Sequence, residues 1–171
     1  MKITFISDTH GLHNKLTNDL PGGWMIIHCG DVSNVGRIDE INLNAGNAIV
    51  IGSGILEVLG IRDSGDIDIV VSNDIFENIS ANNKFKKTKS YGDTVLTYNN
   101  LEVRKSWNVL GKQRNLKDLI QNSVVYDGVR YISLEFLLRV KKQWVAEANS
   151  RKKDLKDIKL IESYLSTKKL I

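Results

Sequence analysis

Two aspartates stand one residue apart in an otherwise apolar run of the chain. Asp66 and Asp68 belong to "GDIDIVV", residues 65–71, where β-branched residues predict a strand. Side chains at positions i and i+2 of a strand project from the same face, so the two carboxylates would repel each other. Shared divalent cations would remove this cost, and Mg²⁺ binds a few carboxylate oxygens together with substrate phosphates. The pair therefore predicts a magnesium site with Asp66 and Asp68 as ligands.

A third acid and a glycine-rich turn fit the same chemistry. Glu102 lies between two apolar residues of a later predicted strand, so it could join the aspartates on one face of a sheet. The Gly52-Ser53-Gly54 turn lies between a predicted strand, 47–52, and a short predicted helix. Its glycines would let a phosphate approach the backbone, the helix N-terminus would supply free N–H groups, and Ser53 would add a hydroxyl donor. These features together predict phosphoryl chemistry on a nucleoside triphosphate.

The motifs resemble those of the nucleotidyltransferase superfamily related to DNA polymerase β. The resemblance is carried by "IGSG" at 51–54, "RDSGDID" at 62–68 and "LEV" at 101–103, and it covers about residues 46–165. Their spacing looks most like that of the small members, which include lincosamide and aminoglycoside nucleotidyltransferases and nucleotidyltransferase-like toxins of phage-defence modules.

This resemblance implies an activity and a set of site residues. It assigns catalysis and metal binding to Asp66, Asp68 and Glu102, the last as third ligand or general base. It assigns triphosphate binding to Gly52 and Ser53, and Arg62 occupies the position of an arginine in the motif of the small enzymes. We therefore expect transfer of a nucleoside monophosphate from a nucleoside triphosphate to an acceptor hydroxyl, with two Mg²⁺ ions and release of pyrophosphate.

Charge is unevenly distributed along the chain, whose net charge is +4. Residues 1–83 hold 4 Lys/Arg and 11 Asp/Glu, a net of −7, whereas residues 84–171 hold 20 and 9, a net of +11. A basic half beside metal-binding carboxylates suits a polyanionic ligand. RNA and a small molecule are both open as the acceptor, and the basic half favours an anionic one.

The last predicted helix contributes much of this positive charge, in the segment "RKKDLKDIK" at 151–159. We include Lys153 among the nucleotide-binding candidates, and three further lysines lie on one side of the helix: Lys152, Lys156 and Lys159. They could meet phosphates of the nucleotide or of an RNA acceptor, or they could form a solvated face. Four aromatic residues could stack on a base or belong to the core: Trp107, Tyr126, Trp144 and Tyr164.

The first 36 residues resemble a different family, the calcineurin-like metallophosphoesterases. The resemblance lies in "SDTHG" at 7–11 and "HCGDVSNVG" at 28–36, and it implies three metal ligands, Asp8, His10 and Asp31. Because no histidine follows His28, the ligand set of a two-metal site is incomplete. We interpret the three residues as vestigial, and the chain as a gene fusion of a truncated phosphoesterase-like segment, 1–44, with a nucleotidyltransferase domain, 45–171.

The composition fits a cytoplasmic protein with a sizeable core. Of the 171 residues, 42% are apolar, and the single Cys29 excludes an intramolecular disulfide. No apolar run approaches the roughly 18 residues that span a bilayer, and the first residues become polar too soon for a signal peptide. We expect no membrane partner.

The hydrophobic pattern predicts an α+β fold, with a mixed sheet carrying the three acids, flanking helices and an N-terminal β-α-β segment. Strands are expected over 84–90, 93–99 and 101–107, a helix over 115–122, and a hairpin that turns at Asp127-Gly128. Two helices with apolar stripes end the chain. The stripes are Leu134, Leu137, Leu138 and Val145 in the first helix and Leu155, Ile158, Ile161 and Leu165 in the second.

Two alternative functions belong to other classes. The N-terminal Asp/His motif could hydrolyse phosphodiesters as a metallophosphoesterase. The chain could also be a non-catalytic nucleotide- or RNA-binding module of the toxin-antitoxin type. The complete set of carboxylates favours the transferase over the non-catalytic module, and the missing histidines disfavour the phosphoesterase.

Overall fold

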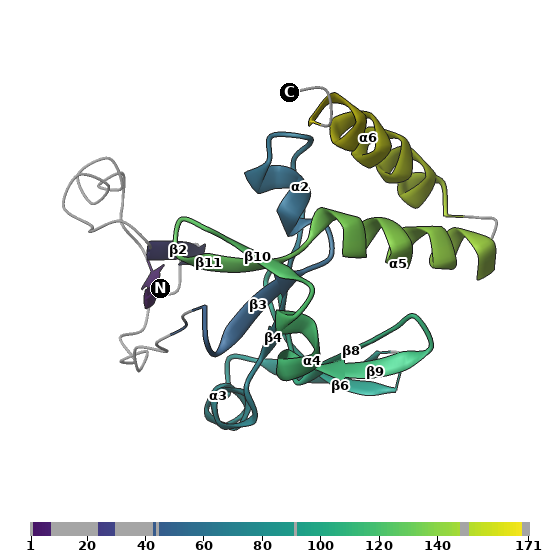
Figure 1. Ribbon diagram of the computed structural model, residues 1–171. Helices are drawn as coiled ribbons and strands as arrows, with labels where there is room; N and C mark the ends of the chain where they lie inside the picture. The colour runs from purple at the N-terminus through teal and green to yellow at the C-terminus, as the bar shows by residue number, and fades with distance from the viewer. Residues whose placement is uncertain are drawn as a thin grey trace.

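The computed structural model describes residues 2–7, 24–29, 43, 45–90, 92–147 and 151–168 (Figure 1). The fold is α+β, as the sequence predicts. β1, Lys2–Ser7, and β2, Trp24–Cys29, form a parallel pair and match the two predicted N-terminal strands. The helix predicted between them lies outside the described residues.

In the described part of the chain, seven strands form the central sheet in the order β10-β11-β3-β4-β7-β6-β5. Their bounds are Ala48–Ile51 for β3, Ile67–Val71 for β4, Lys86–Ser90 for β5, Asp93–Tyr98 for β6, Leu101–Arg104 for β7, Ser123–Tyr126 for β10 and Val129–Ile132 for β11. β4 pairs antiparallel with β3 and parallel with β7, so the sheet is mixed. A separate hairpin consists of β8, Ser106–Val109, and β9, Lys112–Asn115.

Helices pack on both faces of the sheet because side chains alternate along its strands. Among the described residues the helices are α2, Gly54–Val58, α3, Asn73–Ser80, α4, Leu116–Ile120, α5, Leu134–Glu147, and α6, Lys152–Lys168. Ile49 and Val70 pack in one core cluster with residues of α2, α4, α5 and α6. Val50 and Ile69 pack in the other cluster with α3. In the described part of the chain, no helix combines the length and apolar character needed to cross a membrane.

The single strand predicted over 101–107 is wrong, since β7 and β8 belong to different sheets. Val103 packs in the cluster beneath α3, whereas Trp107 packs in the cluster on the other face. One continuous strand would have placed both odd-numbered side chains on the same face, and the chain instead bends at Lys105. This bend carries Trp107 to the face of the sheet that holds the predicted acids.

Charged residues hold α6 against α5. Ile161 is fully buried as predicted, but the predicted apolar stripe is wrong at Leu155, which is 42% exposed. Asp154 and Asp157 are buried instead. Lys141 of α5 reaches both, with its Nζ 2.7 Å from Asp154 Oδ1 and 2.8 Å from Asp157 Oδ2. These ion pairs offset the cost of burying the two carboxylates.

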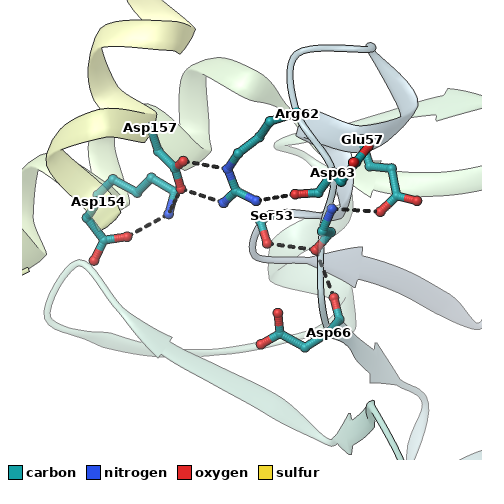
Figure 2. Close-up of polar contacts among 9 residues, drawn as sticks. Ser53, Glu57, Arg62, Asp63, Asp66, Asp154 and Asp157 are labelled. Carbon is teal, nitrogen blue, oxygen red and sulfur yellow. Dashed lines mark hydrogen bonds and ion pairs between the residues drawn. The ribbon is translucent and has the colours of Figure 1, made fainter. Parts of the chain in front are cut away.

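Asp157 also binds Arg62, which lies in the loop after α2 (Figure 2). Nε and Nη2 of Arg62 donate hydrogen bonds of 2.6 and 2.7 Å to the two carboxylate oxygens. Burial alone would raise the pKa of Asp157, but the hydrogen bonds from Arg62 and Lys141 outweigh it and hold that pKa below its ordinary value. The carboxylate thus connects the loop before β4 with both C-terminal helices.

β5 is an outer strand of the described sheet and is rich in lysine. Lys86, Lys87 and Lys89 are exposed. The Nζ of Lys87 donates to Ser80 Oγ at 3.1 Å. The ammonium groups of the strand therefore stand on the surface at one end of the sheet.

Asp157→Asn should destabilise the protein by about 3–5 kcal/mol, because it breaks a buried ion-pair network and leaves Lys141 and Arg62 short of a carboxylate. Equilibrium unfolding in urea measures the loss. Glu162→Gln, on the same helix, is the matched control. Its ion pair with Lys142 is about half exposed, with side-chain exposures of 48% and 54%, and should contribute only about 0–1 kcal/mol. Equal losses in the two variants would contradict a structural role for the buried network.

Acid should weaken the same interaction. The folded pKa of Asp157 is lower than its unfolded value of about 4, so its contribution to stability is complete above about pH 4 and is lost as the pH falls through the folded pKa. Between about pH 6 and about pH 2 the wild-type free energy of unfolding should fall more than that of Asp157→Asn. Parallel profiles for the two proteins would be the contrary result.

Candidate functional site

The three predicted acids come together near the centre of the sheet. β4 pairs with β7 in a register that places Asp68 beside Glu102. Asp66 precedes β4 by one residue, so it projects on the same side as Asp68. All three residues line one cavity of about 370 Å³. Carboxylates from two neighbouring strands thus form one side of a shared space.

Gly52 lies at the end of β3 and borders the same cavity. Its φ of +63° falls in the left-handed region that favours glycine. Because Ile51 pairs with Asp68, the turn at Gly52 lies against that carboxylate, and a Cβ at position 52 would come 3.1 Å from Asp68 Oδ2. The absence of a side chain here keeps backbone and carboxylate close together and leaves the cavity open.

The other nucleotide-binding candidates are not among the residues that line this cavity. The hydroxyl of Ser53 is 2.8 Å from that of Ser64, which in turn donates to the carbonyl oxygen of Asp66 at 2.9 Å (Figure 2). Arg62 is held in the buried ion-pair network, and Lys153 is exposed on α6. The helix after the turn, α2, has only five residues, so its dipole adds little to phosphate binding.

Arg104 is a member of the site that the motifs did not indicate. Its Nη2 forms an ion pair with Glu102 Oε2 and lies 3.9 Å from Asp68 Oδ1. Its Nε is buried without a hydrogen-bond partner among the described residues. The sequence could have indicated Arg104, because residues 102 and 104 of one strand project from the same face of the sheet.

Burial and like charge act together on Asp68. Its side chain is 25% exposed. Burial, followed by the negative charge of Glu102, raises the pKa of Asp68 to about 7, although Arg104 acts in the opposite direction. A carboxyl group with this pKa is partly protonated near neutral pH, and a bound cation would favour its ionised form.

The donor groups fit Mg²⁺ in kind, because carboxylate oxygens are its usual protein ligands. Among the described residues, however, no three acidic, histidine or cysteine side chains are grouped closely enough to hold a metal ion. Glu102 is paired with Arg104, so a site built from all three carboxylates requires Glu102 to exchange that partner. Asp66 and Asp68 could hold a cation without that exchange.

The rest of the cavity is lined by residues from distant parts of the chain. They are Ile51, Ser90, Asp93, Trp107, Asn108, Trp144 and Arg151. Asp93 is buried, and its Oδ1 accepts hydrogen bonds from Ser106 Oγ at 3.0 Å and Gln113 Nε2 at 2.6 Å. Of these residues, sequence reasoning had named only the tryptophans as candidates for stacking, because nothing local in the pattern relates α5 or Arg151 to the acids.

The N-terminal segment contains three predicted metal ligands. Asp8, His10 and Asp31 all lie outside the described residues. Their interpretation as vestigial metal ligands, and the division of the chain at residues 44 and 45, stay predictions.

Comparison of the chain with protein-family models, with curated proteins and with solved structures found no significant match.

The raised pKa of Asp68 predicts how stability depends on pH. Between about pH 4, its unfolded pKa, and about pH 7 Asp68 binds more protons in the folded protein than in the unfolded chain, so its contribution to the free energy of unfolding falls as the pH rises. Asp68→Asn should remove this contribution and should stabilise the protein by up to about 4 kcal/mol at about pH 8, because a pKa of about 7 instead of about 4 corresponds to that free energy. Urea unfolding at several pH values measures both effects.

Asp63→Asn is the control for this measurement, because Asp63 is exposed in the same loop and does not line the cavity. It should keep the wild-type profile. An Asp68→Asn profile that also follows the wild type would show that Asp68 titrates at an ordinary pKa.

Proposed function

We propose that the chain is a Mg²⁺-dependent nucleotidyltransferase that transfers a nucleoside monophosphate from a nucleoside triphosphate to an acceptor hydroxyl. The single observation that carries the proposal is the register between β4 and β7. It brings Asp68 beside Glu102, with Asp66 on the same side and Gly52 at the edge of the same cavity. The sequence motifs of the resembled superfamily support it, because the residues that line this cavity include its three acids.

Each residue of the site has a role in the proposed reaction. Asp66 and Asp68 would hold Mg²⁺, with Glu102 as third ligand or general base. When bound, the metal ions would supply positive charge that offsets the charge developing on the phosphates. Gly52 leaves its backbone open to the triphosphate, and Arg104 holds Glu102 in the cavity.

The bond changes follow from this arrangement. The oxygen of the acceptor hydroxyl attacks the α-phosphorus in line, and its proton passes to a carboxylate oxygen of Glu102. The bond between the α-phosphorus and the bridging oxygen breaks, so pyrophosphate leaves. The acceptor is an alcohol of RNA or of a small molecule.

Calorimetric titration with each of the four ribonucleoside triphosphates and Mg²⁺ tests the proposal. The wild type should bind at least one nucleotide, and Asp66→Ala/Asp68→Ala should weaken that binding by about a hundredfold or more, because the phosphates would then meet no metal. Asp63→Asn should bind like the wild type, since its carboxylate lies outside the cavity.

Two results would count against the transferase. One is no binding of any nucleotide by the wild type. The other is unchanged binding by the double variant, which would place the nucleotide elsewhere. If binding behaves as expected, release of pyrophosphate in the presence of candidate RNA and small-molecule acceptors then identifies the acceptor class.

A further inference from the structure

The cavity has an aromatic part in addition to its carboxylates. Trp107 and Asn108 come from β8, Trp144 comes from α5, and Arg151 immediately precedes α6. Of the three predicted acids, Glu102 comes from β7, Asp68 comes from β4, and Asp66 immediately precedes β4. A ligand that fills the cavity therefore meets charged oxygen atoms on one set of elements and ring surfaces on another.

The two tryptophans form a firmly packed pair. Their ring centroids are 6.0 Å apart with an interplanar angle of 74°, an edge-to-face contact. Trp107 is only 7% exposed and also packs against Phe136, with centroids 6.4 Å apart. Trp144 is partly buried against the same core cluster. Little conformational freedom remains to be lost when a ligand packs against this pair.

Arg151 lies over Trp144 and lines the cavity. The central carbon of its guanidinium group is 4.6 Å from the ring centroid, and its Nη1 donates to Asp154 Oδ2 at 3.1 Å. Its side chain is 31% exposed. A guanidinium plane fixed in this way is, like an aromatic ring, a surface on which bases stack. The side-chain amide of Asn108 adds one donor group and one acceptor group of the kind that pair with the polar edge of a base.

Charge indicates which part of a nucleotide belongs here. The lining holds four carboxylates, those of Asp66, Asp68, Asp93 and Glu102, against two guanidinium groups. Phosphates placed there without a metal would be repelled, whereas an uncharged aromatic heterocycle would not. The metal-binding side suits the phosphates, and the tryptophan and arginine surface suits the base.

We propose that Trp144, Arg151 and Asn108 form a subsite for the base of the nucleoside triphosphate. This inference rests on the proposed function, because it gives a binding position to the base of the same nucleotide whose phosphates the proposed metal site would bind. It predicts that the cavity distinguishes a nucleotide from a bare chain of phosphates.

The test compares ligands on the wild-type protein in the presence of Mg²⁺. The preferred nucleoside triphosphate should bind about tenfold to a hundredfold more tightly than inorganic tripolyphosphate, the usual range for stacking of one base. Tryptophan fluorescence gives a second readout, since two of the three tryptophans of the chain line the cavity. The nucleotide should change this fluorescence, and tripolyphosphate should leave it nearly unchanged.

Trp144→Leu should remove most of the preference for the nucleotide while leaving tripolyphosphate binding as it was. Tyr164→Leu is the matched control, because Tyr164 is a partly buried aromatic residue packed against the same core cluster but does not line the cavity. It should keep the wild-type preference. The ligand comparison on the wild type needs no variant, so it decides the matter even if Trp144→Leu fails to fold.

Failure of this inference and failure of the proposed function give different results. Equal affinity for tripolyphosphate and for all four nucleotides would overturn the base subsite and leave the metal-phosphate site standing. A preference that survives Trp144→Leu in full would also overturn the subsite. Absence of binding by any of these ligands would overturn the proposed function and, with it, the subsite.

Discussion

β4 is held on both sides, and its register on each side determines what the cavity contains. Against β3, Asp68 pairs with Ile51, which brings the carboxylate to the turn at Gly52. Against β7, the same residue pairs with Glu102. A slip of one residue in either pairing would turn Asp68 toward the face covered by α3 and place Ile69 in the cavity. The apolar side chains of β4 oppose that slip, because Ile69 and Val71 are buried beneath α3. The hydrophobic core thus orients the acids without touching the ligand.

The C-terminal helices bring the second half of the cavity to this sheet. Trp144 and Arg151 lie near the point where α5 ends and α6 begins, and Asp154 joins Arg151 to Lys141 of α5. Buried ion pairs of this kind contribute less to stability than their number suggests, since each charge must first lose its water. Their geometry is demanding, however, and Asp157 satisfies Arg62 and Lys141 together. The network therefore specifies how α6 lies against α5 and against the loop before β4.

The sequence is informative where a signal is local. The strand at Ile67–Val71 and the common face of Asp66 and Asp68 follow from alternation over a few residues, and the short helix after β3 follows from the apolar run at 55–60. The pairing of Glu102 with Asp68 depends on strand order, which no single segment encodes. The break between β7 and β8 was missed because Leu101, Val103 and Trp107 keep the odd-numbered spacing of a single strand, although Lys105 interrupts their alternation and the packing partners change face there.

The inward-facing acids of α6 were missed for a different reason. Hydropathy assigns a carboxylate to solvent, and the buried partners of Asp154 and Asp157 lie on α5 and on a loop about 95 residues earlier in the chain. Arg62 illustrates the same limit. Its position in the motif suggested a ligand contact, whereas in the fold its guanidinium group is engaged by Asp157. Spacing identifies which residues belong to a motif, but only the fold shows which partner each one has.

The lysines of β5 bear on how copies of the molecule behave toward one another. An outer strand presents unpaired backbone N–H and C=O groups, and a second sheet can add to such a strand. Lys86, Lys87 and Lys89 are exposed along β5. If the β5 strand of a second copy approached this edge, its own ammonium groups would meet these three, and the like charges would repel each other. At the opposite edge of the described sheet, β10 has only four residues and exposes Val125. Its short length, and not charge, limits pairing with a strand of another molecule. The two ends of the sheet thus differ in their resistance to aggregation, and high salt, which screens charge, weakens the protection at β5 alone.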